Sequence, residues 1–264
     1  VRSIAEFVRK RRVLSGFKNR LKKDLLFLKD RIEKLERKKE RARLLSSIEK
    51  LKERIEKLSG LSEEFRSLIP GNLLHREILA LNSFFLRSKG YSGLSVWHSY
   101  RYAPLSPFAE PTSNQVEISV ALMRGEWRAE VLNLTNATGK SLKVLLYFEG
   151  VPGSPLPSWV RCFEVAFIDT VAGQIVADPL LPAERTDRAW TVEVPSGITR
   201  QVWFTFKVNR LKPGIYSGQI CISSQAGNRS VPFKLEVGEF SFPKQPRLSL
   251  GLWDYTDDPP SRDI

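Results

Sequence analysis

The protein has 264 residues, of which 42% are hydrophobic, and a formal net charge of +13. This length is enough for one or two domains with hydrophobic cores. No run approaches the roughly 18 to 20 consecutive apolar residues that a membrane-spanning helix needs, which excludes a helical membrane protein.

The positive charge is concentrated at the N-terminus. Residues 1–60 hold 21 of the 42 basic residues and nine of the 29 acidic ones, for a net charge of +12. Such asymmetry is found in arms that bind nucleic acid or anionic membranes. Here the charges alternate with a regular apolar stripe, which favours the solvated surface of a helix. We therefore do not expect nucleic acid as a partner.

Two apolar stripes with helical spacing follow one another in this basic segment. The three- and four-residue steps place the members of each stripe on one face of a helix. Each face would expose an apolar seam unless another helix covered it. The first stripe is Leu21, Leu25, Leu28, Ile32 and Leu35, and the second is Ile48, Leu51, Ile55, Leu58, Leu61, Phe65 and Leu68.

Two arrangements satisfy both stripes. One is an antiparallel hairpin that turns near residues 40–47, where Ser46-Ser47-Ile48-Glu49 resembles a capping box that starts a second helix. The other is one continuous helix that self-associates as a coiled coil, because neither Gly nor Pro interrupts residues 17–59. A further helix is predicted over Leu73–Arg87.

After Gly93 the pattern changes to short β-type runs separated by turn signals. In Gln201–Val208, apolar residues alternate so that Val202, Phe204 and Phe206 share a face, and Trp203 falls outside the core. Such spacing without intervening helices predicts an antiparallel immunoglobulin-like β-sandwich, so the chain as a whole is α+β. The predicted strands are Val116–Met123, Trp127–Leu134, Leu142–Phe148, Val160–Ile168, Trp190–Val194, Gln201–Val208, Ile215–Ser223 and Ser230–Val237.

Local features of the predicted sandwich indicate fold rather than chemistry. Pro213-Gly214 suits a tight turn, and Tyr216 behind it is placed to form a tyrosine corner. Cys162 and Cys221 either form one disulfide or remain two buried thiols. His75 and His98 are the only histidines, and no cluster of His and Cys exists, so we expect no metal and no cofactor.

Several motifs in a fixed order resemble one family. Together they look like the β-sandwich that precedes the (β/α)8 barrel in bacterial glycoside-hydrolase-like proteins, of the β-N-acetylgalactosaminidase type known as glycoside hydrolase family 123. The likeness covers roughly residues 115–255 and omits the helices. The motifs are Leu122-Met-Arg-Gly-Glu-Trp-Arg128, Asn133-Leu-Thr-Asn136, Val176-Ala-Asp-Pro-Leu180, Pro195-Ser-Gly-Ile-Thr-Arg-Gln-Val-Trp203, Leu211-Lys-Pro-Gly-Ile-Tyr-Ser-Gly218, Val231-Pro-Phe-Lys-Leu-Glu-Val237, Phe240-Ser-Phe-Pro243 and Gly251-Leu-Trp-Asp-Tyr255.

This resemblance implies that Leu248–Tyr255 begins a barrel whose catalytic Asp-Glu pair lies further along, so no catalytic residue is assigned here. It leaves Trp253 and Asp254 as candidates for carbohydrate binding, since the ends of barrel strands point toward active sites. It also favours an extracellular or periplasmic location. The expected units are a basic helical segment (1–92), a connector (93–114), the sandwich (115–240), and a linker with the start of a truncated barrel (241–264).

Two functions follow from this organisation. The first is a non-catalytic accessory region that supports the downstream barrel, with carbohydrate as a possible ligand and the helices as a possible means of self-association. The second is a non-enzymatic surface or adhesion module, in which a coiled-coil stalk presents the sandwich. Because the chain starts at Val1 and stops within the expected barrel strand region, we expect a fragment of a longer protein.

Overall fold

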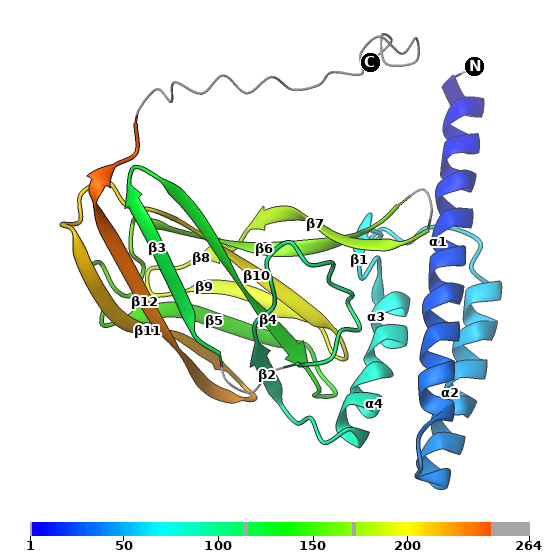
Figure 1. Ribbon diagram of the computed structural model, residues 1–264. Coiled ribbons are helices and arrows are strands. Elements are labelled where there is room, and N and C mark those ends of the chain that lie inside the picture. The colour runs from blue at the N-terminus through cyan, green and yellow to red at the C-terminus, as the bar shows by residue number, and fades with distance from the viewer. Residues whose placement is uncertain (1, 113–115, 171–172, 244–264) are drawn as a thin grey trace.

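The computed structural model describes residues 2–112, 116–170 and 173–243. A pair of long helices is followed by two shorter helices and then by two packed β-sheets, so the α+β prediction is confirmed (Figure 1). The long helices stand at one end of the sandwich and the short helices lie between the two (Figure 1).

The long helices form a hairpin, as the first of the two arrangements predicted. In α1 (Arg2–Glu33) and α2 (Lys38–Glu56) the first stripe packs against the second as far as Ile55, with Leu28, Ile32 and Ile55 fully covered. The continuous helix is therefore wrong. The rest of the second stripe, from Leu58 to Leu68, lies beyond the end of α2, so the prediction that it continues the helical face is wrong. Among the described helices, none is both long enough and apolar enough to cross a membrane.

The turn of the hairpin lies at residues 34–37, so the predicted turn at 40–47 was placed too late. The supposed capping box, Ser46–Glu49, lies inside α2, where the Ser47 hydroxyl donates to the carbonyl of Arg43. The charged residues before it, from Lys38 to Arg43, are mostly good helix formers and belong to α2. Arg41 then donates to the Leu35 carbonyl in the turn at 3.2 Å and to the carbonyl of Glu33 at 3.4 Å, which is a group that the end of α1 leaves free.

The single helix predicted over Leu73–Arg87 is two short ones, α3 (Leu73–Ala80) and α4 (Asn82–Ser88). Asn72 begins α3, because its side chain accepts a hydrogen bond from the His75 backbone N–H at 2.9 Å.

The described strands form two sheets. Sheet A runs in the order β1 (Leu68–Ile69), β6 (Val160–Asp169), β10 (Thr199–Lys207), β4 (Trp127–Asn136) and β2 (Leu94–Trp97). Beside it, β7 (Ile175–Pro182) pairs with β6. Sheet B runs in the order β3 (Ile118–Arg124), β12 (Gly227–Ser241), β11 (Gly214–Ser224), β5 (Leu142–Glu149), β9 (Trp190–Val194) and β8 (Glu184–Arg185).

All eight predicted strands are present within a few residues of their expected limits, and four others were missed. Two of these, β1 and β8, have two residues each, too few for any periodic signal. The third, β2, falls in the segment expected to be an irregular connector. The fourth, β7, contains prolines, which are tolerated at a sheet edge and hide a strand from pattern recognition.

The pairing is antiparallel except between β3 and β12, which run parallel in register with Ile118 opposite Phe233. A tight hairpin forces its two strands to be antiparallel, but β3 and β12 are separated by most of the sandwich sequence. The expectation of a purely antiparallel fold therefore fails at this one pair.

The inner faces of the two sheets share a compact core. Phe148, Phe204, Phe206 and Phe233 are all fully buried in it, as the alternation in β10 predicted. The tyrosine corner is confirmed, because the Tyr216 hydroxyl donates to the Lys212 carbonyl at 2.9 Å.

The two cysteines are both buried and free, one in each sheet, so the disulfide alternative is wrong. Burial raises the pKa of Cys162 and of Cys221 above the ordinary value of a thiol.

A second core joins the helices to sheet A. It contains the apolar stripes of α1 and α2 together with Trp97, Phe167 and Ile198 from strands or strand ends, and Leu105 and Phe108 from the segment between β2 and β3. The helices are therefore packed against the sandwich and do not form a separate stalk.

One glycine marks where the helices and the sandwich meet most closely. Gly197, between β9 and β10, has φ +79°, and a Cβ there would collide with the Leu79 carbonyl oxygen of α3. We expect Gly197→Ala to lower the free energy of unfolding by more than about 1 kcal/mol in urea denaturation. Gly139→Ala, which meets no atom within 4 Å, is the control and should have little effect. Equal effects of the two would contradict this account.

Candidate functional site

The residues that the resemblance assigns to a site, Trp253 and Asp254, lie outside the described residues and stay predictions. The described tryptophans fall into two groups. Trp97, Trp159 and Trp190 are buried in the two cores. Trp127 and Trp203 belong to neither core, and Trp203 is half-buried, as its position opposite Phe204 predicted.

Strand alternation brings Trp203 to the outer face of sheet A, which is the face turned away from sheet B. In β10 the side chains of Val202 and Phe204 enter the sandwich core, so Trp203 between them points the other way. Its cross-strand neighbours are Val131 on β4 and Phe163 on β6.

The segment after β2 carries two tyrosines onto this outer face. A turn closes where the Ala103 backbone N–H donates to the Tyr100 carbonyl at 2.9 Å. Arg101 forms an ion pair with Glu130 at 2.9 Å, and the segment is held again where Asn133 donates to the Ser99 hydroxyl at 2.9 Å. The position of the tyrosines is therefore fixed by bonds to β4.

The two tyrosines and Trp203 form a cluster that is open to solvent. The Tyr102 ring lies 5.9 Å from that of Trp203 and 5.6 Å from that of Tyr100. Tyr100 and Tyr102 are 63% and 66% exposed. The Arg101 guanidinium stands 5.1 Å from the Tyr102 ring centre, a cation–π distance. We call Tyr100, Arg101, Tyr102 and Trp203 the aromatic face.

The positive charge of the aromatic face is carried by Arg101. The pKa of Arg101 lies above its ordinary value because of its hydrogen bond with Tyr102 and the neighbouring Glu130 carboxylate, which together outweigh its partial burial. The guanidinium therefore remains a cation at any physiological pH.

A cavity of about 360 Å³ opens beside Tyr102 and Trp203. Its polar groups are Arg101, Asp178 and Gln201, and Leu180 of β7 contributes an exposed apolar wall. Exposed rings beside a few polar groups can hold a sugar ring by stacking and hydrogen bonding, or can pack against the apolar surface of another domain.

A further exposed aromatic ring, Trp127 of β4, lies on the same outer face of sheet A. Its cross-strand neighbour is Lys207 of β10. Trp127 is 49% exposed, and its ring has the Lys207 ammonium at 4.8 Å and the Arg161 guanidinium at 5.2 Å. The Trp127 ring is therefore flanked by two positively charged side chains.

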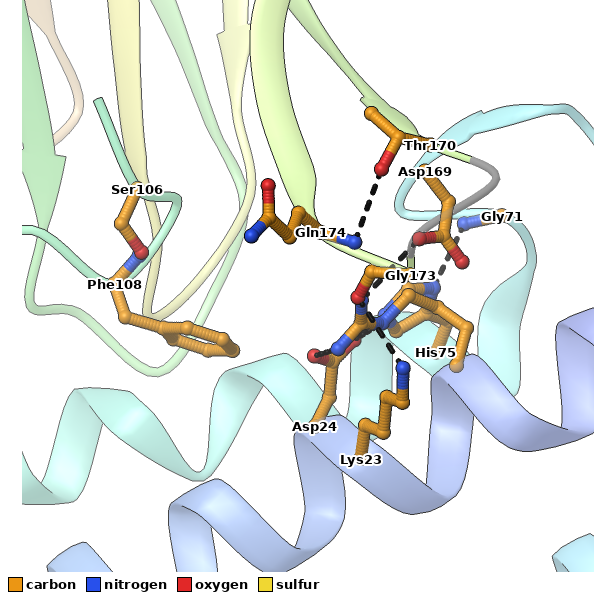
Figure 2. Close-up of polar contacts among 11 residues, drawn as sticks. Lys23, Asp24, Gly71, His75, Ser106, Phe108, Asp169, Thr170, Gly173 and Gln174 are labelled. Carbon is orange, nitrogen blue, oxygen red and sulfur yellow. Dashed lines mark hydrogen bonds and ion pairs between the residues drawn. The ribbon is translucent and has the colours of Figure 1, made fainter. Parts of the chain in front are cut away.

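A second concentration of polar groups, which we call the polar junction, lies where α1 meets α3 and the β6–β7 turn (Figure 2). Arg20 donates to both carboxylate oxygens of Asp24, at 2.7 and 3.1 Å, and the same carboxylate lies 2.8 Å from Nε2 of His75. Arg20 also donates to the Gly173 carbonyl at 3.1 Å. Asp24 and His75 are almost fully buried.

The polar junction links α1 to α3 and the β6–β7 turn through side chains that are hydrogen-bonded to one another. The Gly71 backbone N–H donates to Nδ1 of His75 at 3.1 Å, so the proton of the neutral ring is on Nε2, where it is donated to Asp24. Both ring nitrogens are thus occupied. Sequence reasoning missed this set because Asp24 and His75 are far apart in the chain and belong to no local motif.

Two carboxylates on the sandwich edge, Glu164 and Glu193, have shifted pKa values. Burial raises the pKa of Glu164. Burial also acts to raise the pKa of Glu193, but the hydrogen bond and charge of Arg76 bring it below its ordinary value. Each is already engaged, Glu164 with Arg200 at 3.1 Å and Glu193 with Arg76 at 2.6 Å. Within the described ranges, no group of three or more His, Cys, Asp or Glu side chains could hold a metal ion.

The described residues thus form a two-sheet sandwich with a helical hairpin packed on one sheet and an exposed aromatic face on the same sheet. No family model matches the sequence, and no curated protein matches it either. Among solved structures, a family 123 glycoside hydrolase from Clostridium perfringens matches with 12% identity and a TM-score of 0.42. The match covers 58% of this chain and 28% of that enzyme.

Two other matches cover almost the whole of a shorter chain. A PapD-like domain of human CEP192 matches with 14% identity and a TM-score of 0.28, and covers 55% of this chain and 99% of its own. The CooA pilin subunit of enterotoxigenic Escherichia coli matches with 12% identity and a TM-score of 0.28, over 57% of this chain and 99% of its own. With TM-scores below 0.5, none of these likenesses bears on what this chain does.

Proposed function

We propose that this chain is a non-catalytic accessory region of a glycoside-hydrolase-like protein and supports a (β/α)8 barrel that follows it. The observation that carries the proposal is the aromatic face. Large exposed rings clustered on an otherwise well-packed sandwich are expected where another domain or a ligand is bound. We take the domain that binds the aromatic face to be the barrel, because the motif order between residues 115 and 255 resembles that of a sandwich that runs directly into such a barrel.

In this proposal Tyr102 and Trp203 pack against the barrel, and the neighbouring cavity receives one of its side chains. Arg101 and Asp178 form the polar rim of the contact. The buried polar junction and the helical hairpin stiffen another part of the same outer face of sheet A. The substrate is bound and cleaved by the barrel, whose expected first strand includes Trp253 and Asp254.

The test compares residues 1–264 with the longer product of the same gene. An aryl β-N-acetylgalactosaminide should be hydrolysed by the longer protein and left intact by residues 1–264. Turnover by residues 1–264 alone, or its absence in the longer protein, would overturn the proposal.

The contact itself is tested by the double substitution Tyr102→Ser and Trp203→Ser. In the longer protein it should weaken the coupling of sandwich and barrel by about 2 kcal/mol or more, because rings at the centre of an interface carry most of its energy. In residues 1–264 it should change the urea midpoint only slightly. Ile215→Ser, which replaces a residue that is 62% exposed on sheet B, is the matched control. The same small effect of the double variant in both proteins would contradict docking through the aromatic face.

A further inference from the structure

A cavity separate from the aromatic face lies where the helical region meets the open edge of the sandwich. It measures about 570 Å³, which is within the range of small-molecule sites. Its walls come from the segment before α3 (Arg66–Pro70), from the β6 and β7 side of sheet A, and from the β5, β8 and β9 side of sheet B. Elements distant in the sequence therefore converge on it.

Arg200 of β10 lines this cavity and is only 5% exposed. Its polar contacts are made by Nη1, which is 3.1 Å from a Glu164 carboxylate oxygen and donates to the Val165 carbonyl at 3.3 Å. Its Nε has no hydrogen-bond partner among the described residues. The Nε edge of a guanidinium is one of the two edges that can donate a pair of parallel hydrogen bonds to a carboxylate. In Arg200 the Nε–H makes no hydrogen bond to the described residues.

A second unsatisfied group belongs to the same cavity. Thr191 of β9 is 8% exposed and lines it, and the Thr191 hydroxyl also has no hydrogen-bond partner. A buried polar group without a partner costs free energy, so each case in a folded protein needs an explanation. Two such groups on the wall of one cavity, contributed by different sheets, have a common explanation in a ligand that satisfies both.

The charges around the cavity favour an anion. Four basic and three acidic side chains line it. Arg76 pairs with Glu193, and Arg200 pairs with Glu164. Arg66 and Lys143 have no ion pair within the described part of the chain, and the remaining acid is Glu184, so the unpaired charge is positive.

The lining also limits the shape of the ligand. Among the described residues, no aromatic side chain lines the cavity, so they offer no platform for stacking a sugar ring or a base. Its apolar wall is aliphatic and includes Leu68, Ile69, Leu181 and Pro182. We infer that this cavity binds a small aliphatic carboxylate, held by Arg200 and Thr191. Because Nε of Arg200 and the Thr191 hydroxyl are both covered in the structure, both side chains must shift toward the cavity when the ligand enters.

This inference does not depend on the proposed accessory role, and it is tested on residues 1–264 with succinate as the probe. At low ionic strength, succinate up to about 10 mM should raise the melting temperature in a saturable way, and calorimetry should give one site. Succinamide, which has the same carbon skeleton without the charge, should produce no shift.

The variant that tests the assignment is Glu164→Gln combined with Arg200→Met, which removes the pair together so that neither charge is left buried alone. It should weaken succinate binding by about tenfold or more, since a charge-assisted hydrogen bond is lost. Thr191→Val should weaken it less. Lys207→Met, on the outer side of β10 opposite Trp127, should leave it unchanged.

Three results would overturn the inference. They are no succinate-dependent shift in the unsubstituted protein, equal binding of succinate and succinamide, and undiminished binding in the double variant. Binding of inorganic phosphate as tight as that of succinate would overturn the assignment to carboxylates.

Discussion

Replacing Phe148 by alanine is expected to lower the free energy of unfolding by about 3–5 kcal/mol, the usual loss when a fully buried aromatic ring is truncated. Phe148 has no exposed surface, and its ring centre lies 5.1 to 6.3 Å from those of four other aromatic residues. These come from both sheets and are Trp159, Trp190, Phe204 and Phe233. The cavity left by the substitution would therefore lie at the centre of the sandwich.

Urea denaturation followed by tryptophan fluorescence measures this loss, because two of the neighbouring rings are indoles. Phe240→Ala is the matched control, since Phe240 is 76% exposed at the end of β12 and should contribute little to stability. A loss below about 1 kcal/mol for Phe148→Ala would mean that the two sheets do not pack as described.

Replacing Asp24 by alanine should destabilise the protein by a similar amount, about 3–5 kcal/mol. The reason differs, because no large volume is lost. The substitution leaves Arg20 and His75 buried without their shared acceptor, and uncompensated buried polar groups are costly. Since the polar junction ties α1 to α3 and the β6–β7 turn, we expect the helical hairpin to loosen first.

Hydrogen exchange measured by mass spectrometry distinguishes this outcome from general unfolding. Protection should fall most in α1, α2 and α3 and least in β11 and β12. Glu77→Ala breaks an ion pair with Arg54 that is about half exposed, and it should cost no more than about 1 kcal/mol. Uniform loss of protection in Asp24→Ala, or equal effects of the two substitutions, would contradict the anchoring role.

Much of the secondary structure is predictable from the sequence because it depends on local periodicity. The steps of three and four residues from Leu21 to Leu35 place one face of α1, and the alternation from Val202 to Phe206 places the inner side of β10. The same alternation correctly places Trp203 outside the sandwich core. Each of these inferences uses residues only a few positions apart.

Only part of the aromatic face is predictable from the sequence. The sequence places Trp203 on the outer side of its strand but gives no reason to bring Tyr100 and Tyr102 beside it. That arrangement depends on the ion pair of Arg101 with Glu130, which joins a loop to a strand about thirty residues further along the chain. The cavity at Arg200 is likewise not predictable from local sequence, because its walls come from both sheets and from the helical region.

Hydrophobic periodicity specifies which face of each element is buried, and it is therefore sufficient to predict the α+β class, the amphipathic helices and eight of the strands. The folded chain alone shows where the hairpin turns, that β3 runs parallel to β12, and that the helices share a core with sheet A. It also shows the contact of Asp24 with His75 and the cavity at Arg200. These features depend on contacts between residues remote in sequence, and such contacts leave no periodic signal in the chain.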